Sequence, residues 1–344
     1  MQRPGLPIRV GIIGCGGISK AHALGFSHLP DLFEVRAVCD IDQEAARRLA
    51  GTFPATRVLT DWEDVVGDPE IEAIDILLPH HLHLPVGVSS LRAGKHVCVE
   101  KPLGVNLSQG RELIREADAA KTVFMVAFNE RHRWSVRTIR QIVDDGRIGD
   151  VYMVRTDHNQ NPRFGETSWY RNRDLAGGGA VLGSGIHMLD LLHWFCGNAT
   201  RVSASMLALP QLPGAEAAAS VTVEFAPRRE GLPGSIGTLD ISWAAPNHPW
   251  YQFLVVYGTK GSVSTLRGDT VSLCTPEGTE EFRGPDGEAW TDSFPEELRH
   301  WGECIERSER PLTDARDAFA SLEMCMAAYR SVETHSSVSL PLQE

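Results

Sequence analysis

The features that the chain lacks exclude several classes of protein. No apolar run approaches the roughly 20 residues of a membrane-spanning helix, and the first residues lead into a strand pattern rather than an apolar signal segment. The seven cysteines form no CxxC pair and lie at no zinc-ligand spacing with histidine. Lysine and arginine are scattered, and the formal net charge is -12. We therefore expect a cytoplasmic protein with reduced thiols and small-molecule partners, with neither a membrane nor nucleic acid among them.

The composition that is present suits two compact domains. The chain has 344 residues, of which 42% are hydrophobic and 23% charged, and this is more than one hydrophobic core usually holds. Up to about residue 128, short runs such as IRVGIIG and EVRAVCD alternate with helical patterns, which predicts a parallel sheet covered by helices on both faces. Beyond it, longer strand patterns alternate apolar and polar residues, which predicts a large, mostly antiparallel sheet with one open face. We place the two domains of this α/β chain at residues 1–128 and 129–344.

A glycine-rich turn directly follows the first predicted strand. Gly14, Gly16 and Ser19 form a GxGxxS variant of the dinucleotide-binding GxGxxG/A pattern. Gly14 permits the tight turn, Gly16 lets backbone amides approach a pyrophosphate, and the small Ser19 permits close packing of the following helix. The flanking strand and helix favour a Rossmann dinucleotide-binding domain over an ordinary turn. Gly17 and Ile18 complete the predicted cofactor loop.

An acidic residue ends the second predicted strand. Asp40 stands where the dinucleotide pattern places a carboxylate for the hydroxyls of the adenosine ribose. A carboxylate there repels the 2′-phosphate of NADP, and neither Ile41 nor Asp42 supplies a cation to receive that phosphate. NAD is therefore the predicted cofactor, with Ile41 beside it. The alternative is that Asp40 is a solvated cap of the following helix.

Three histidines follow the next strand pattern. The segment LPHHLH, residues 78–83, lies at the carboxyl edge of the predicted sheet, where such sheets bind ligands. A metal site is one interpretation, but no Asp, Glu or Cys in the segment completes a ligand set. We favour a loop that closes over the nicotinamide end of the cofactor without a metal, with contacts from Leu78, Pro79, His80 and His83.

The strand pattern that begins at His96 ends in Glu100-Lys101-Pro102, again at the carboxyl edge. A lysine there can reach the oxygen of the reacting carbon and stabilise negative charge as an alcohol is deprotonated. Pro102 fixes its own φ and would hold the turn. A Glu-Lys pair at the surface after a strand is commonplace. The tripeptide therefore indicates a functional site only because it lies at the carboxyl edge of the predicted sheet. We place Glu100 and Lys101 beside the cofactor and Lys101 in the chemistry.

In order along the chain, the glycine turn, Asp40, PHHLH, AGKHVCVEKPL and GGGAVLGSGIHMLDLLHW resemble the Gfo/Idh/MocA oxidoreductases. The resemblance covers nearly the whole chain, and EKP followed by a GGG…GxH segment is more specific than the glycine turn. It implies a Rossmann domain and a C-terminal α/β domain that serves for substrate binding and for dimer or tetramer contacts. It also implies tightly held NAD(P), and sugar, inositol or related hydroxyl substrates. A homodimer or homotetramer is therefore expected.

Within that resemblance, Lys101 matches the EKP lysine and His187 matches the GxH histidine, which the family uses beside the substrate hydroxyl. An imidazole suits removal of the hydroxyl proton while hydride passes to the nicotinamide, and Lys101 would polarise the same oxygen. Gly185 would let the ligand come close, and Asp190, one helical turn after His187, would orient its ring. The other interpretation of His187 is a hydrogen-bonded core histidine.

The chain departs from the family pattern before His187. The family carries an Asp four residues earlier, and here that position is Gly183. Either Lys101 and His187 suffice, or another group such as His158, Tyr170 or a substrate hydroxyl takes over the contact. Gly183 is also expected to leave space beside the reacting carbon for a bulkier substrate such as a glycoside.

A second departure lies in the turn after the sixth strand pattern. Asn129-Glu130-Arg131-His132 resembles the family's Asn-x-Arg-Phe turn, but His132 stands where an aromatic hydrocarbon is common. We predict that Asn129 lies beside the cofactor and that Arg131 and His132 contact the substrate.

The segment between the two glycine-rich motifs is rich in groups that bind sugar hydroxyls. Amides and arginine satisfy hydroxyls in pairs, and an aromatic ring covers an apolar sugar face. The alternative is a plain polar loop. The predicted substrate contacts here are His158, Asn159, Arg163, Trp169 and Tyr170. The run Gly177-Gly178-Gly179 is interpreted as a flexible turn before the active-site helix, and not as a phosphate loop.

Three functions fit these residues. We favour an NAD-dependent dehydrogenase or ketoreductase acting on a hydroxyl of a sugar, glycoside or inositol. The second is an NAD-dependent glycosidase, in which transient oxidation permits elimination of the glycosidic bond without net redox change. The third is a non-enzymatic nucleotide-binding regulator, against which the presence of both Lys101 and His187 argues.

Overall fold

The computed structural model describes residues 5–166, 168–209, 215–245, 251–267, 270–285 and 289–343. The chain divides into two compact units. The first contains Met1–His132 and Trp290–Phe319, and the second contains Arg133–Ala289 and Ala320–Glu344. The structure thus departs from a single boundary after residue 128, because the chain returns to the first unit near its end.

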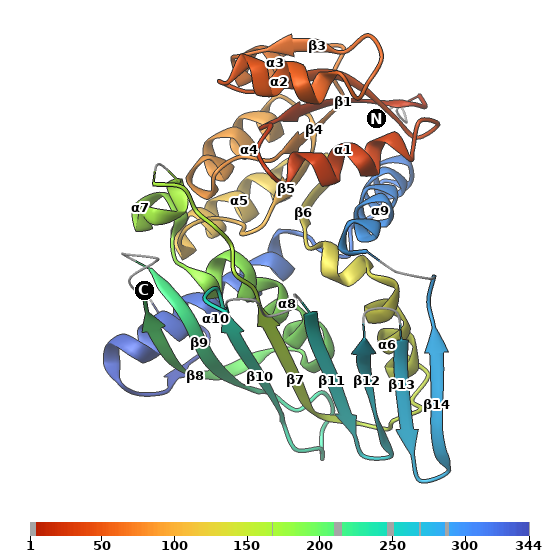
Figure 1. The fold of residues 1–344 in the computed structure, drawn as a ribbon, viewed down its shortest axis with the longest axis vertical. Helices are drawn as coiled ribbons and strands as arrows, with labels where there is room; N and C mark the ends of the chain where they lie inside the picture. Colours follow the sequence, from red (N-terminus) through yellow and green to blue (C-terminus); the bar gives the residue numbers. More distant parts are fainter. Residues whose placement is uncertain are drawn as a thin grey trace. The chain divides into compact units, whose positions relative to one another are not determined.

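The first unit is built on a parallel six-stranded sheet with helices on both faces (Figure 1). Its strands are β1 (Ile8–Ile13), β2 (Phe33–Cys39), β3 (Arg57–Leu59), β4 (Ala73–Ile76), β5 (His96–Glu100) and β6 (Phe124–Ala127). Its helices are α1 (Ser19–Ser27), α2 (Gln43–Ala50), α3 (Trp62–Gly67), α4 (His83–Arg92), α5 (Leu107–Ala119) and α9 (Ser293–Arg307), with the short turns η1 (His80–Leu82), η2 (Asn129–His132) and η5 (Trp290–Asp292). The strand order β3-β2-β1-β4-β5-β6 is that of dinucleotide-binding sheets. The predicted Rossmann fold is confirmed.

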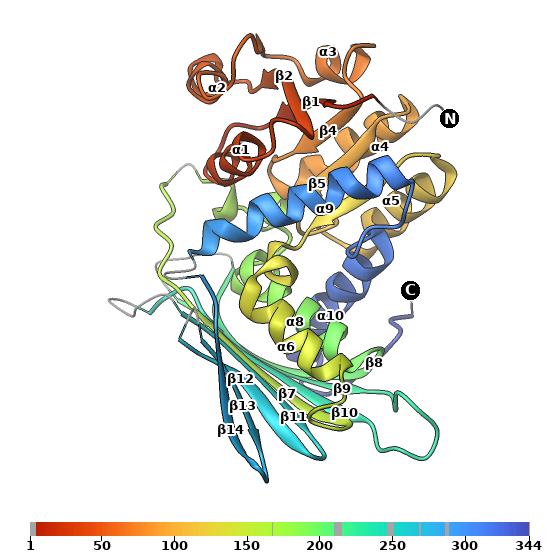
Figure 2. The same ribbon diagram turned by 90° about the vertical axis from the view of Figure 1, so that its right-hand side faces the viewer.

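Burial explains why the strands of this sheet read as continuous apolar runs. Val10 and Ile12 point to one face of β1 and Ile13 points to the other, and all three are 1% exposed or less, since helices cover the sheet on both sides. Helix α9, which the sequence analysis did not predict, lies beside α1 (Figure 2). Trp301 of α9 stacks on Phe33 with ring centroids 5.6 Å apart. This amphipathic helix is the reason that residues 290–319 belong to the first unit.

The second unit is built on a nine-stranded sheet in the order β14-β13-β12-β11-β7-β10-β9-β8-β15. Its strands are β7 (Val151–Asn159), β8 (Ala199–Ala208), β9 (Glu216–Phe225), β10 (Ser235–Ser242), β11 (Tyr251–Gly258), β12 (Gly261–Arg267), β13 (Thr270–Thr275), β14 (Gly278–Arg283) and β15 (Val338–Ser339). Its helices are α6 (Trp134–Asp144), α7 (Arg173–Ala176), α8 (Ile186–Cys196), the short η3 (Trp169–Arg171), the π-helix η4 (Val181–Gly185) and most of α10 (Ala315–Thr334). Only β7 and β10 pair in parallel among the described ladders of this sheet, so the predicted mostly antiparallel sheet is confirmed.

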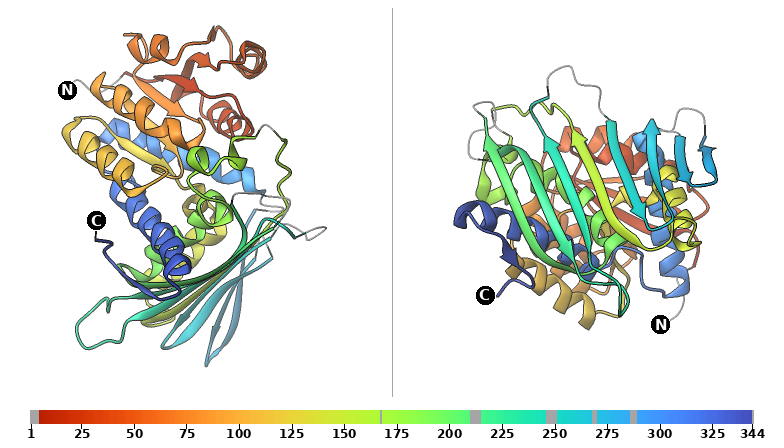
Figure 3. Two further views of the ribbon diagram at one scale, coloured as in Figure 1. Left: turned by 90° about the vertical axis from the view of Figure 1, so that its left-hand side faces the viewer. Right: turned by 90° about the horizontal axis from the view of Figure 1, so that it is seen from below.

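One face of this sheet carries the helices of the second unit. Helices α6 and α8 pack on it (Figure 2), and the strands lie in front of the helices when the sheet is seen from the other side (Figure 3, right). Strand β9 shows the resulting alternation: Val221 and Val223 are buried, whereas Ser220 and Thr222 are exposed. The predicted open face is present in this single chain.

Among the residues that the structure describes, one apolar helical segment passes the length and composition test for a membrane span. It covers Arg173–Cys196, and 83% of its most apolar window is buried inside the structure. A core helix of a soluble protein has the same properties, and α8 packs against β7 and β10.

Candidate active site

In the glycine turn between β1 and α1, contacts within the protein require glycine at one position but not at two others. Gly14 has φ +103°, and a Cβ there would lie 2.3 Å from the Leu77 carbonyl oxygen, so only glycine fits. A Cβ at Gly16 or Gly17 would meet no atom of the described residues within 4 Å. Packing therefore requires Gly14, whereas no contact with the described residues requires glycine at the other two positions. The Ser19 hydroxyl donates to the Gly16 carbonyl oxygen at 2.6 Å and fixes the end of the turn.

Asp40 is joined to the glycine turn. Its Oδ2 accepts the backbone N–H of Cys15 at 2.7 Å, and its Oδ1 accepts the N–H of Asp42 at 2.8 Å. The cap of α2 is Asp42, whose carboxylate accepts from Glu44 and its neighbour Ala45, so the alternative role of Asp40 as the helix cap does not hold. The adjacent Ile41 side chain is 94% exposed. The turn, the carboxylate and an uncovered apolar side chain form one edge that fits the adenosine half of a dinucleotide.

The histidine segment is a structural link. The His83 ring is fully buried, with Nδ1 2.8 Å from the Pro102 carbonyl oxygen and Nε2 2.8 Å from that of Leu78. Burial lowers the pKa of His83 more than these backbone contacts raise it. The contact of Nδ1 with the Pro102 carbonyl oxygen ties the loop after β4 to the EKP turn. His80 packs against it, with ring centroids 5.7 Å apart. The cofactor contacts of Leu78, Pro79, His80 and His83 stay predictions.

The EKP turn begins at the end of β5. Glu100 is 8% exposed and accepts a hydrogen bond from His22 of α1. Burial lowers the pKa of Lys101, and the negative charge of Glu100 acts in the opposite direction. A lysine with a lowered pKa is a recurrent feature of catalytic sites. No three His, Cys, Asp or Glu side chains of the described residues come together in a way that could hold a metal ion.

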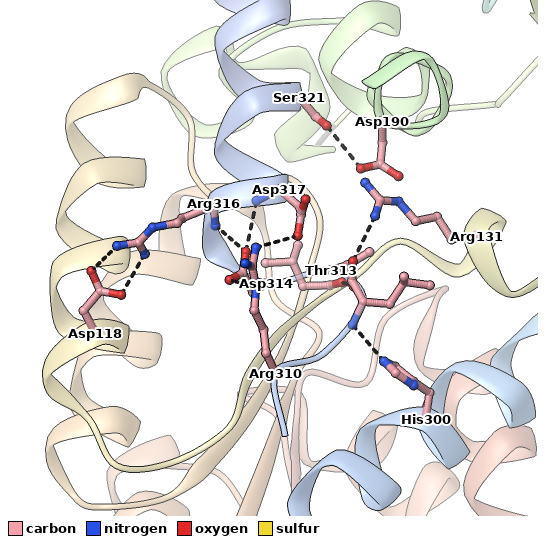
Figure 4. Close-up of polar contacts among 12 residues, drawn as sticks. Asp118, Arg131, Asp190, His300, Arg310, Thr313, Asp314, Arg316, Asp317 and Ser321 are labelled. Carbon is pink, nitrogen blue, oxygen red and sulfur yellow. Dashed lines mark hydrogen bonds and ion pairs between the residues drawn. The ribbon is translucent and has the colours of Figure 1, made fainter. Parts of the chain in front are cut away.

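The turn after β6 is anchored inside the first unit. Asn129 donates from its amide to the Ser293 hydroxyl at 2.9 Å, and the His132 ring lies 5.3 Å from that of His300. The Arg131 guanidinium donates to the Leu312 carbonyl oxygen at 2.9 Å (Figure 4). All three predicted ligand contacts are thus 4% exposed or less and serve to hold residues 290–319 on the first unit. Their contacts with cofactor or substrate stay predictions.

Neighbouring polar contacts complete this anchor. Thr313 donates to the Val126 carbonyl oxygen at 2.7 Å, and Arg316 forms a bidentate pair with Asp118 at 2.7 and 2.8 Å (Figure 4). The first contact fixes the segment to β6 and the second to α5.

In the second unit, His187 lies in the first turn of α8, directly after the π-helix η4. π-Helical turns are rare and occur frequently at functional sites. The segment before it is firmly held: Glu216 of β9 accepts the backbone N–H groups of Gly179 and Val181 at 2.8–3.1 Å, and the Tyr329 hydroxyl at 2.9 Å. A Cβ at Gly178 would lie 2.0 Å from the Tyr329 oxygen. The glycine run is therefore tightly packed, and its interpretation as a flexible turn was wrong.

Gly183 does not leave empty space. A Cβ there would lie 2.3 Å from the indole ring of Trp243 and 3.2 Å from the ring of Tyr170. The indole occupies the position that a side chain at 183 would need. The expectation of vacated space beside the reacting carbon was therefore wrong at this atom, because an aromatic ring from the end of β10 replaces the missing carboxylate.

Around Gly183, four aromatic side chains form a cluster, which we call the aromatic wall: Phe164, Trp169, Tyr170 and Trp243. The ring centroids of Trp169 and Tyr170 are 3.9 Å apart and stacked, and Tyr170 meets Trp243 edge-on at 5.5 Å. Phe164 lies 5.1 Å from Trp243. The sequence analysis singled out Trp169 and Tyr170 but missed Phe164 and Trp243. An aromatic residue at the end of a strand was the available signal for Trp243.

A hydrogen-bonded chain runs along the same wall. The Gln160 amide nitrogen lies 2.7 Å from His158 Nε2 and 2.7 Å from the Ser184 hydroxyl, which also accepts the Trp243 indole N–H at 2.9 Å. The Gln160 amide and the Ser184 hydroxyl therefore join His158 to Trp243 in one chain of polar contacts. The structure thus brings His158, Tyr170 and Gly183 together. Gln160 and Ser184 are further polar groups that the sequence analysis did not select.

The remaining predicted residues of this unit lie elsewhere. Asn159 donates to Asp157 two residues earlier, and Arg163 is exposed. Asp190 is fully buried and accepts from the Ser321 hydroxyl at 3.3 Å (Figure 4). Its predicted effect on the His187 ring stays a prediction.

Comparison with known families agrees with these features. Residues 8–128 match the model "Oxidoreductase family, NAD-binding Rossmann fold", and residues 136–264 match the model "GFO/IDH/MocA C-terminal domain". The chain belongs to the GFO/IDH/MocA oxidoreductase family. The resemblance found from the EKP and GxH motifs is thereby confirmed.

Within the GFO/IDH/MocA family, the similar proteins include dehydrogenases. The levoglucosan dehydrogenase of Pseudarthrobacter phenanthrenivorans is 27% identical over 284 residues, 74% of this chain and 73% of that protein. The myo-inositol 2-dehydrogenase of Thermotoga maritima is 25% identical over 342 residues, 97% and 98% of the two chains. This GFO/IDH/MocA member is an NAD-binding oxidoreductase related to sugar and inositol dehydrogenases.

Solved structures share the fold over almost the full length. A levoglucosan dehydrogenase in complex with NADH and levoglucosan has a TM-score of 0.90 at 22% identity, with 97% of this chain and 99% of that chain covered. At this identity the likeness establishes the fold.

Proposed function

We propose that the protein is an NAD(H)-dependent dehydrogenase or ketoreductase that transfers hydride between the nicotinamide and a secondary hydroxyl or ketone of a sugar, glycoside or inositol. The proposal rests on the presence of both motif residues in this member of the family. Lys101 lies at the end of β5, and His187 lies in the first turn of α8. A nucleotide-binding regulator would need neither side chain.

The cofactor assignment rests on the glycine turn and the edge next to it. Gly16 and Gly17 leave the turn free of side chains, Asp40 presents a carboxylate for the ribose diol, and Ile41 offers an apolar surface for the adenine. NAD, when bound, supplies the acceptor for the hydride.

The chemistry of the chain's own residues follows from their types. The Lys101 ammonium polarises the substrate oxygen and stabilises the negative charge that develops there. His187 accepts the hydroxyl proton as the carbon loses hydride, and in the reverse direction it returns that proton to the forming alkoxide. The stacked Trp169 and Tyr170 rings suit the apolar C–H face of a pyranose, which favours a sugar or glycoside.

An assay with two simultaneous readouts tests the proposal. Purified protein is incubated with NAD or NADP and with inositols, free sugars and glycosides, while nicotinamide absorbance and release of the aglycone are followed together. NADH formation supports the dehydrogenase. Aglycone release without net NADH identifies the glycosidase instead, and NADH binding without turnover of any compound identifies the regulator.

Removing the charge of Asp40 is expected to change cofactor choice. In Asp40→Asn, loss of a charge-assisted hydrogen bond to the ribose should reduce the preference for NADH over NADPH by roughly 10–100-fold. The dissociation constants of both cofactors are measured by nicotinamide fluorescence. Asp42→Asn, which removes the same charge from the cap of α2, is the matched control and should keep the wild-type ratio. An unchanged ratio in Asp40→Asn would remove the ribose contact from the proposal.

We further propose a cytoplasmic homodimer or homotetramer that uses the nine-stranded sheet. Leu207 and Ile236, on β8 and β10, are 57% and 41% exposed, and apolar side chains on an open sheet are usually covered. Ile236→Lys with Leu207→Lys should convert the oligomer to a monomer in light scattering, whereas Glu277→Lys in the exposed turn before β14 should not. An oligomer that survives the double substitution contradicts the use of this face.

A further inference from the structure

A cluster of buried ionisable side chains lies next to the EKP turn and takes no part in the chemistry above. It combines His22 of α1, Asp75 of β4, Glu100 of β5 and Glu297 of α9, all within the first unit. His22 Nδ1 lies 2.9 Å from Asp75 Oδ2, and His22 Nε2 lies 3.2 Å from Glu100 Oε1. The side chains of His22 and Asp75 are 0% exposed and that of Glu100 is 10% exposed. One imidazole ring therefore bridges two carboxylates away from water.

The sheet register explains why the two carboxylates meet one ring. Asp75 pairs with Cys98 across β4 and β5, and Glu100 lies two residues beyond Cys98 on the same strand. Side chains two residues apart in a strand point to the same face, so both carboxylates face α1. The Phe294 ring of α9 packs against His22 with centroids 5.2 Å apart and closes the cluster.

Each carboxylate needs a hydrogen donor, and a doubly protonated ring supplies both. Burial acts to lower the pKa of His22, but Asp75 and Glu100 outweigh it and raise that pKa well above the usual range. Burial acts to raise the pKa of Glu100, but the hydrogen bond from His22 and the charge of Lys101 lower it. The imidazolium thus balances one carboxylate, and the Lys101 ammonium balances the other.

The remaining groups that face the cluster are uncharged or repel further negative charge. Both Glu297 oxygens are buried without a hydrogen-bond partner among the described residues, and burial, with the nearby carboxylates of Glu100, Asp75 and Glu130, raises its pKa well above the usual range. The Cys98 thiol is also kept neutral, since burial raises its pKa. Among the described side chains, His22 is therefore the cation within the cluster, and Lys101 is the cation next to it.

We propose that His22 is a positioning residue, which as an imidazolium fixed between Asp75 and Glu100 keeps the Glu100 carboxylate ionised and through it keeps the Lys101 ammonium charged. The catalytic consequence rests on the proposed function, because a charged Lys101 is what polarises the substrate oxygen. Without the cation at position 22, a proton on Glu100 relieves the repulsion from Asp75. Lys101 then loses the charge that opposes its burial.

Lysine titration tests this independently of turnover. The chain has five lysines, Lys20, Lys95, Lys101, Lys121 and Lys260, so their amines can be labelled by reductive ¹³C-methylation, resolved by NMR and assigned with Lys→Arg variants. In His22→Gln the pKa of Lys101 should fall by about one unit, the lower end of the shift that one neighbouring charge causes. The other four lysines should titrate as in the wild type.

Three variants separate positioning from general loss of structure. Glu297→Gln replaces a neutral acid by an isosteric amide and should leave Lys101 unchanged. His96→Gln removes a partly buried β5 histidine outside the cluster, bonded to the backbone of Val123, and should also leave it unchanged. Glu100→Gln keeps the shape but removes the carboxylate through which His22 is proposed to act, so it should also lower the pKa of Lys101.

The experiments test the positioning role of His22 and the proposed dehydrogenase function separately. If dehydrogenase turnover is found, the alkaline limb of its kcat/KM profile should move to lower pH with the Lys101 pKa, since activity is lost as pH rises through that pKa. A natively folded His22→Gln protein with an unchanged Lys101 titration overturns the positioning role. If His22→Gln does not fold, an unchanged Lys101 titration in Glu100→Gln overturns it, because the charge of Glu100 is the link through which His22 is proposed to act. Absence of turnover in the wild type contradicts the proposed function and leaves the NMR result valid.

Discussion

Replacing Lys101 by methionine or His187 by glutamine is expected to lower kcat by about 10²–10⁴-fold in each case, the usual contribution of a positioned proton-transfer or charge-stabilising group. If both groups serve one reaction step, as proposed, the double variant should be little worse than the poorer single one, because the effects of such residues are not additive. Steady-state kinetics on the substrate identified by the two-readout assay provide the measurement.

Two matched variants control for the loss of a cation or of an imidazole elsewhere. Lys121→Met and His28→Gln alter exposed side chains of the first unit and should retain wild-type kcat. NADH binding should persist in all four single variants, since the glycine turn and Asp40 are untouched. A Lys101→Met or His187→Gln enzyme with wild-type kcat would exclude that residue from the chemistry.

A methyl group at position 183 should be costly. Gly183→Ala would place a Cβ within 2.3 Å of the Trp243 ring, and overpacking of this kind reduces the free energy of unfolding by about 1–3 kcal/mol. Trp243→Phe shortens the ring, so Gly183→Ala should cost much less in that background. A double-mutant cycle in chemical denaturation, followed by near-ultraviolet circular dichroism, measures the coupling.

Gly165→Ala is the control, because a Cβ at Gly165 meets no atom within 4 Å in the described part of the chain. The same logic applies to the family's carboxylate: Gly183→Asp should destabilise the protein unless Trp243 is also made smaller. Equal stability of Gly183→Ala and Gly165→Ala would show that the indole does not fill this position.

Local patterns predicted the first unit well. Continuous apolar runs, the GxGxxS turn and an acidic residue after the second strand are consequences of a covered parallel sheet that binds a dinucleotide. Strand β3 and helix α3 were missed, since they are only three and six residues long, and periodicity needs a longer window.

The return of residues 290–319 to the first unit was outside the reach of pattern analysis. The α9 residues Phe294, Leu298, Trp301 and Ile305 have helical spacing and are all 1% exposed or less, so the pattern was present. The pattern predicts that the helix buries one face, but it does not indicate which of the two sheets that face packs against. Contacts between residues far apart in the sequence decide that question.

The residues of the candidate site also fall into two groups: those that sequence motifs select and those that only the tertiary structure selects. Lys101, His187 and Asp40 could be selected as candidates from the sequence because each stands at a fixed place in a motif. Trp243 and His22 were not found, because their importance comes from partners at distant positions: Gly183 lies 60 residues before Trp243, and Glu100 lies 78 residues after His22. The packed GGG turn was misread for the same reason, since Glu216 and Tyr329 hold it from other elements.

The sequence by itself determined the family, the two sheet types, the dinucleotide turn and the motif positions of Lys101 and His187, because these depend on residue types at short, fixed spacings. Only the tertiary structure decided what fills the place of the missing carboxylate at Gly183, which helix completes the first unit, and which buried charges surround the EKP turn. Packing and electrostatics act through space, and a buried ring or ion pair is specified by neighbours that the linear order of residues does not reveal.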